Sequence, residues 1–275
     1  MRREAGRDIF LFFLCLHNSG EEERRKMDGQ EKKMKVLCLH GFRTSGSFLR
    51  KQISKWDPSI FHHFHLDFPD GVYPAGGKSD IEGIFPPPYF EWFQFNKEFT
   101  EYKNFEECIS YLCDYITKNG PFHGLLGFSQ GATLSALLIG YQAQGKVLKD
   151  HPPIKFLVSI SGSKFRDPSI CDIAYKDPIK VKSVHFIGEK DWLKLPSEEL
   201  AAAFDNPLIL RHPQGHTVPR LDEAAAKQLS EWTASITRSE FACGTSVPKN
   251  VECEMNNIKH EAIADPKCIE APSAA

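Results

Sequence analysis

The sequence has no apolar run of about 18 residues, no C-x-x-C pair and no large excess of either charge. The missing apolar run excludes an ordinary membrane-spanning protein, and without paired cysteines a zinc ribbon or thioredoxin-type site has no support. The 34 basic and 36 acidic residues give a formal net charge of −2, which argues against a nucleic-acid-binding protein. No G-x-G-x-x-G follows a strand pattern, so we reject a nucleotide-dependent reductase.

The eight cysteines are scattered along the chain rather than paired. Cys38 lies in an apolar strand pattern, and Cys108 and Cys113 lie in a helical one. A chain of 275 residues, 41% of them hydrophobic, can bury a core that needs no disulfides. We therefore expect reduced thiols and a cytoplasmic location.

The two ends differ in composition from the middle of the chain. An apolar run at 9–16 behind three arginines looks like a secretory signal peptide, but Glu4 and Asp8 interrupt the basic stretch and no typical cleavage site follows. We expect a disordered extension at 1–33 and a disordered tail at 238–275. One folded domain then occupies residues 34–237.

Strand patterns alternate with helical patterns through this domain. Short apolar runs ended by glycine or a turn predict strands, and apolar residues at helical spacing predict helices. The expected strands lie at 35–41, 64–68, 122–126, 155–161, 181–188 and 208–210, and the expected helices at 47–56, 105–116, 132–141, 200–204 and 221–236. The alternation predicts an α/β fold, a mostly parallel, doubly wound sheet with its chemistry at the carboxyl ends of the strands.

The motif Gly127-Phe-Ser-Gln-Gly131 lies between a predicted strand and a predicted helix. A nucleophilic serine on such a sharp turn needs glycines two residues away on either side, because larger side chains would clash. The turn also places the Ser129 hydroxyl at a helix N-terminus, which favours developing negative charge. We predict that Ser129 is a nucleophile; an ordinary glycine-flanked turn is the alternative.

A serine nucleophile needs a base, which in turn needs an orienting acid. In α/β-hydrolases the acid and then a histidine follow the serine along the chain. Asp191 follows the strand predicted at 181–188, and His216 lies between the last predicted strand and the last helix, so these are the predicted acid and base. The alternatives are Glu189, Asp177 and Asp172 for the acid and His212 for the base.

The oxyanion of an acyl-transfer reaction needs two backbone N–H donors. Gln130, directly after the serine, is expected to supply one of them. The loop after the first strand contains His40-Gly-Phe42, so Phe42 is expected to supply the other. His40 is interpreted as a side chain that holds this loop, and a simply packed strand end is the alternative for both residues.

An insertion rich in proline and aromatic residues, Phe85-Pro-Pro-Pro-Tyr-Phe-Glu-Trp-Phe-Gln-Phe95, precedes the second half of the domain. Ligand pockets are mostly apolar, so we predict that this insertion forms a lid or pocket wall. Tyr89, Trp92 and Phe93 are the candidate substrate-contacting residues. Packing on the core and a proline-rich motif for a partner domain are the alternatives.

The segment Met34-Lys-Val-Leu-Cys-Leu-His-Gly-Phe-Arg-Thr-Ser-Gly46 resembles the opening of the FSH family of serine hydrolases. The serine motif, Gly188-Glu-Lys-Asp191 and Gly215-His216 are similar to that family's nucleophile, acid and base positions in the same order. The resemblance covers about residues 34–236 and implies an α/β-hydrolase fold, a cytosolic or nuclear location, and ester hydrolysis without metal or cofactor. Some fungal members look like thioesterases.

We therefore predict a serine hydrolase that cleaves carboxylic esters or thioesters of acyl substrates through a Ser129–His216–Asp191 triad and an acyl-enzyme. The expected partner is a small-molecule ester, with no nucleic acid and no stable membrane insertion. Two alternatives remain open at this point. One is a non-catalytic small-molecule receptor on a hydrolase fold, and the other is an acyltransferase.

Overall fold

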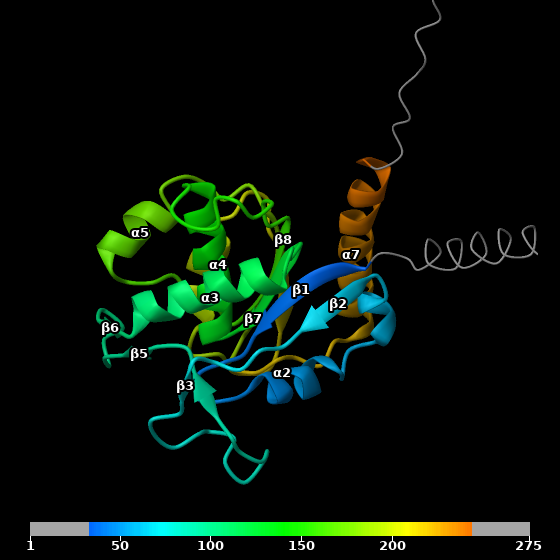
Figure 1. Ribbon diagram of the computed structural model, residues 1–275. Coiled ribbons are helices and arrows are strands. Elements are labelled where there is room, and N and C mark those ends of the chain that lie inside the picture. The colour runs from blue at the N-terminus through cyan, green and yellow to red at the C-terminus, as the bar shows by residue number, and fades with distance from the viewer. Residues whose placement is uncertain (1–32, 244–275) are drawn as a thin grey trace, which may run out of the picture.

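The computed structural model describes residues 33–243 (Figure 1). All but the last residue of the extension expected at 1–33, and most of the tail expected at 238–275, lie outside these residues. The centre of the described part is a parallel sheet in the order β2-β1-β7-β8-β9-β10. Its strands are β1 (Met34–Leu39), β2 (Phe64–Asp67), β7 (Gly124–Phe128), β8 (Phe156–Ile160), β9 (Lys182–Gly188) and β10 (Leu208–His212). The predicted parallel α/β fold is confirmed.

Helices cover both faces of the sheet because alternate strand residues point to opposite sides. In β1, Leu37 and Leu39 pack into the layer of α3–α6, and Val36 and Cys38 pack into the layer of α2 and α7 (Figure 1). The helices are α2 (Gly46–Ile53), α3 (Phe105–Asn119), α4 (Gln130–Ala143), α5 (Pro168–Ala174), α6 (Lys194–Ala201) and α7 (Glu223–Cys243). Within the described residues, no helix is long and apolar enough to cross a membrane.

Some elements differ from the sequence prediction. The helix expected at 200–204 is α6, which begins six residues earlier, and α7 continues beyond residue 236. Helix α5 was not predicted, since its seven residues are too few to show a helical period. The segment between β2 and α3, for which no strand is predicted, contains two small antiparallel pairs, formed by β3 (Tyr73–Pro74) with β4 (Phe90–Glu91) and by β5 (Gln94–Phe95) with β6 (Tyr102–Lys103).

The order of the strands determines where a ligand can bind. After β1 the chain goes to β2 on one side, and it later enters β7 on the other side of β1. The loops that follow β1 and β7 therefore diverge at the carboxyl end of the sheet. Such a switch point leaves a crevice, which is the usual ligand site of open α/β sheets. The loop containing Phe42 and the turn containing Ser129 both lie there.

Candidate active site

Ser129 lies on a strained turn between β7 and α4. Its backbone has φ +52° and ψ −117°, a region that costs a non-glycine residue free energy and occurs mainly at functional sites. The two glycines of the motif are sterically required. A Cβ on Gly127 would lie 2.4 Å from the amide nitrogen of Ala132, and one on Gly131 would lie 2.0 Å from the carbonyl oxygen of Leu39.

The structure brings Ser129, His216 and Asp191 into one hydrogen-bonded chain. The Nδ1 atom of His216 lies 3.0 and 3.1 Å from the two carboxylate oxygens of Asp191, and its Nε2 lies 2.9 Å from the Ser129 hydroxyl oxygen. An ionised carboxylate can only accept, so Nδ1 carries the proton and Nε2 is free to accept from the serine. This is the arrangement in which an imidazole can act as a general base.

Asp191 is held in its charged form. Burial by itself raises the pKa of this carboxyl group, but hydrogen bonds from His216 and from the N–H of Leu193, 2.8 Å away, outweigh burial and lower the pKa below its ordinary value. The Asp191 side chain is 1% exposed, whereas the His216 side chain is 23% exposed. The carboxylate of the predicted acid is thus sealed from water, while the ring of the predicted base remains partly exposed.

The alternative acids and base lie elsewhere. Glu189 is exposed and pairs with Lys194 and Arg211. Asp177 is exposed and accepts from Gln144, and Asp172 is an exposed residue within α5. His212 is the last residue of β10, and its carbonyl oxygen accepts the N–H of Glu189. None of these side chains takes the place of Asp191 or His216 beside Ser129.

His40 holds the loop that follows β1. It is fully buried; its Nδ1 lies 2.8 Å from the Gly41 carbonyl oxygen, and its Nε2 accepts the N–H of Gly71. The Trp92 indole donates to the His40 carbonyl oxygen. The expected role of His40 as a side chain that fixes this loop agrees with these contacts.

The two residues predicted to donate to the oxyanion, Phe42 and Gln130, both line a cavity together with Ser129. Gln130 is the first residue of α4, so its backbone N–H has no acceptor inside the helix.

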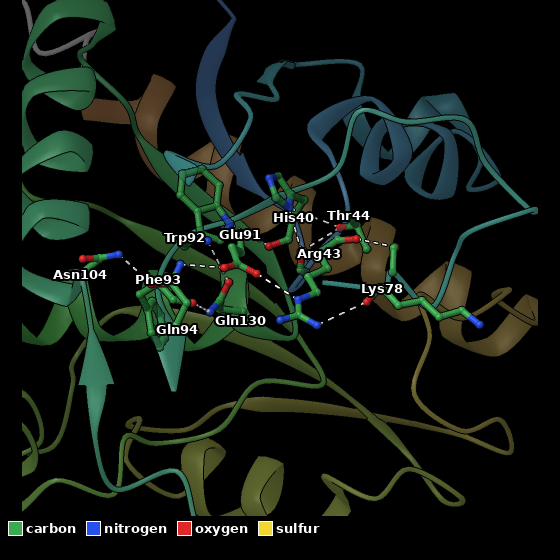
Figure 2. A network of polar contacts seen from close by, with 12 residues as sticks. His40, Arg43, Thr44, Lys78, Glu91, Trp92, Phe93, Gln94, Asn104 and Gln130 are labelled. Carbon is green, nitrogen blue, oxygen red and sulfur yellow. Dashed lines mark hydrogen bonds and ion pairs between the residues drawn. The ribbon is translucent and has the colours of Figure 1, made fainter. Parts of the chain in front are cut away.

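The Gln130 side chain has a role that the sequence did not reveal. Its amide oxygen accepts the N–H of Trp92 and its amide nitrogen donates to the carbonyl oxygen of Phe93 (Figure 2). The residue after Ser129 therefore clamps the main chain of the aromatic insertion against the serine turn. Side-chain amides can pair with a backbone in this way because they carry both a donor and an acceptor.

An ion pair ties the same insertion to the loop after β1. The Arg43 guanidinium donates to the Glu91 carboxylate at 3.0 Å, and Gln94 donates to the other oxygen of Glu91 at 2.7 Å (Figure 2). The Glu91 side chain is 2% exposed, so removal of Arg43 would leave a buried charge without its ionic partner. Arg43 itself has φ +53°. The pair thus braces the loop that carries Phe42.

A cavity of about 560 Å³ opens beside the Ser129 hydroxyl. Its lining includes Phe93, as predicted, but not Trp92 or Tyr89. Trp92 is fully buried and packs its ring on His40, and the Tyr89 hydroxyl donates to the Phe85 carbonyl oxygen. The insertion therefore forms part of the pocket wall through Phe93 and Phe95 rather than through Tyr89 and Trp92. In the described part of the chain, no group of three or more His, Cys, Asp or Glu side chains could hold a metal ion.

The parallel sheet, Ser129 at a strand-to-helix turn, and Asp191 and His216 after later strands are the features of an α/β-hydrolase fold. A solved structure of acyl-protein thioesterase 2 from Zea mays superposes with a TM-score of 0.54 at 15% identity, covering 76% of this chain and 95% of that one. This likeness shows the fold.

The family model described as "Serine hydrolase (FSH1)" matches residues 27–228. The chain belongs to this serine hydrolase family, as its motifs had indicated. A protein named dihydrofolate reductase from Schizosaccharomyces pombe is 30% identical over an alignment of 207 positions, which covers 69% of this chain but 44% of that protein. A protein named esterase from Aedes aegypti is 32% identical over an alignment of 211 positions, which covers 72% of this chain and 74% of that protein.

Because two histidines are buried, we predict that the free energy of unfolding of the protein falls in mild acid. Burial lowers the pKa of His40 to about 4 and that of His185 to about 3. Because the unfolded chain binds these protons near pH 6.5, stability is fully present above that pH and falls as the pH drops toward 4. Each histidine is expected to remove up to about 1.4 kcal/mol of unfolding free energy per pH unit in this window.

Urea unfolding at pH 7.0 and 5.0 measures this effect. The His40→Gln variant should show a smaller difference between the two pH values than the unmodified protein. The exposed His65 supplies the matched control, since His65→Gln should leave the difference unchanged. Equal pH dependence in the His40→Gln and His65→Gln proteins would contradict the prediction.

Proposed function

We propose that this chain hydrolyses carboxylic esters, thioesters included, of small acyl substrates through a covalent acyl-enzyme. The observation that carries the proposal is the hydrogen-bonded chain from Ser129 through His216 to Asp191, with the serine facing a largely apolar cavity. Membership of a serine hydrolase family and a relative named as an esterase support it.

In the first step the Ser129 oxygen attacks the carbonyl carbon of the ester, and its proton passes to Nε2 of His216. Asp191 keeps the imidazole oriented and stabilises the imidazolium that forms. The negative charge that develops on the carbonyl oxygen is stabilised by the N–H groups of Phe42 and Gln130. When the intermediate collapses, His216 gives the proton to the leaving alcohol or thiol, and the acyl group stays on Ser129.

In the second step a water molecule replaces the leaving group. His216 takes a proton from this water as the water oxygen attacks the acyl-serine, and the same two N–H groups stabilise the second oxyanion. The proton then returns to the Ser129 oxygen as the acid product departs. No step in this scheme uses a metal ion or an organic cofactor.

A fluorophosphonate probe, which reacts with activated serines, tests the proposal. The unmodified protein should be labelled, and Ser129→Ala should not, because the Ser129 hydroxyl both lines the cavity and lies 2.9 Å from an imidazole nitrogen. Ser183 also lies 3.1 Å from a histidine nitrogen, that of His185, but this pair is buried and lies outside the cavity lining. The exposed Ser54 provides a matched control, and Ser54→Ala should be labelled as strongly as the unmodified protein. Equal labelling of Ser129→Ala would refute the proposed nucleophile, and absent labelling of the unmodified protein would favour a non-catalytic receptor.

Product analysis separates hydrolysis from acyl transfer. With an activated ester and an added alcohol, the proposal predicts the free acid as the main product, because water discharges the acyl-enzyme. If the new alkyl ester is the main product instead, the chain is an acyltransferase with the same nucleophile.

A further inference from the structure

The cavity beside Ser129 is built largely from aromatic rings. In the described part of the chain 25 residues line it, and nine of them are phenylalanine, tyrosine or tryptophan, whereas aromatic residues make up 12% of the sequence. Of the same 25 residues, the aliphatic ones are Ile81, Leu193 and Pro196. A pocket that needed only to be apolar could use leucine, isoleucine and valine, as the core of this protein does. The composition of the cavity lining therefore indicates that the site requires aromatic side chains in particular.

Four of these rings form a continuous chain along the cavity, which we call the aromatic belt: Phe42, Phe95, Phe99 and Trp192. Successive ring centroids are 4.7, 4.8 and 6.2 Å apart, and Trp192 lies 5.2 Å from the ring of His216. The belt thus runs from the predicted oxyanion residue to the predicted base, around the place where the acyl group of a substrate would be held.

Three further rings continue from the belt into the cavity wall. Phe93 lies 6.2 Å from Phe95 and 5.5 Å from Phe165, and Phe165 lies 4.9 Å from Tyr102, centroid to centroid. Gln130 holds the backbone of Phe93 directly. The backbone of Phe93 is therefore held by a hydrogen bond, and the rings pack against one another, so a ligand would meet them in a set arrangement.

The last member of the belt presents an open face. Trp192 directly follows the predicted acid, lines the cavity and has 62% of its surface exposed. Aromatic rings prefer offset or edge-to-face partners, and such a pair strengthens binding about 2- to 12-fold beyond the area that it buries. A ring in the substrate would complete this series next to His216, whereas a saturated chain would bury area without that gain.

We propose that the acyl group accepted by this site carries an aromatic ring, set a short spacer away from the reacting carbonyl as in a phenylpropionyl group. The ring packs in the aromatic belt between Phe95, Phe99 and Trp192. This proposal rests on the ester hydrolysis proposed above and adds the substrate class. The proposal predicts different kcat/KM values for two substrates of nearly equal size, one with an aromatic ring and one with a saturated ring.

The test compares p-nitrophenyl 3-phenylpropionate with p-nitrophenyl 3-cyclohexylpropionate. The two esters share the leaving group, spacer and number of carbon atoms, and their rates of hydrolysis by hydroxide correct for intrinsic reactivity. We expect kcat/KM for the phenyl ester to exceed that for the cyclohexyl ester by about 10-fold, the upper end of one aromatic pair. A ratio of one or below, with both esters cleaved, overturns the aromatic proposal and leaves ester hydrolysis standing.

Variants of the exposed Trp192 locate the effect. Trp192→Leu should reduce the phenyl-to-cyclohexyl ratio to near one, and Trp192→Phe, which restores a ring, should keep most of it. A purely structural role for Trp192 would change both esters equally and leave the ratio unchanged. Phe61→Leu removes a ring from the opposite layer, outside the cavity lining, and should leave the ratio as it is in the unmodified protein.

Binding to the Ser129→Ala protein tests the same preference without turnover. Calorimetric titration with the two intact esters should show a Kd several-fold lower for the phenyl ester. If the unmodified protein cleaves neither ester, the hydrolase proposal fails, while a phenyl preference in binding would still support the aromatic site. Equal affinities would overturn the aromatic site whatever the result for catalysis.

Discussion

Replacing His216 with alanine is expected to lower kcat for an activated ester by about a million-fold, the scale of loss when one member of a catalytic triad is removed. The Ser129 oxygen would lose the acceptor that lies 2.9 Å away, and no other base would receive its proton during attack. His216 is partly exposed, so the variant should fold. Initial-rate kinetics at saturating substrate measure the loss.

His212 is the natural comparison, because it precedes His216 by four residues and was the alternative base. It lies at the end of β10, and burial lowers its pKa. We expect His212→Asn to retain kcat within about tenfold, since the imidazole bonded to Ser129 belongs to His216. The assignment of the base would be wrong if His212→Asn lost as much activity as His216→Ala.

The predicted triad follows from features that are local in the sequence. Ser129 and Asp191 each come just after a buried strand, and His216 comes a few residues after the last strand. In a parallel sheet all carboxyl ends lie at one edge, so residues 87 positions apart, such as Ser129 and His216, can meet. The motif with its two glycines predicts the nucleophile, and chain order then leaves few candidates for the predicted acid and base.

The pocket could not be predicted in the same way. Trp92 and Phe93 are neighbours in a segment without a long period, yet Trp92 packs behind the site on His40 while Phe93 lines the cavity. Gln130 makes hydrogen bonds to the backbone of both residues, and these contacts between distant positions have no signature in the local sequence. The ion pair between Arg43 and Glu91 joins positions 48 residues apart, and nothing in the local pattern links them.

The predicted oxyanion donors belong to different elements, and one glycine lies where these elements meet. A Cβ on Gly131 in α4 would lie 2.0 Å from the carbonyl oxygen and 2.4 Å from the carbonyl carbon of Leu39 at the end of β1. Leu39 cannot retreat easily, because β1 pairs with β2 on one side and with β7 on the other. We therefore expect Gly131→Ala to lower the unfolding free energy by about 4 kcal/mol or more, a loss typical of severe steric conflict.

Gly76→Ala is the matched control, because a Cβ there would meet only the Glu91 side chain, at 3.4 Å, and its expected effect is within about 1 kcal/mol. Urea unfolding of both variants gives the comparison, and similar stabilities would contradict the prediction.

Any Gly131→Ala protein that folds must separate α4 from the end of β1. That shift would move Gln130 away from the loop of Phe42, so the folded fraction should also lose kcat with little change in KM. Loss of stability and loss of oxyanion stabilisation would then share one cause, the close contact of helix and strand behind the serine.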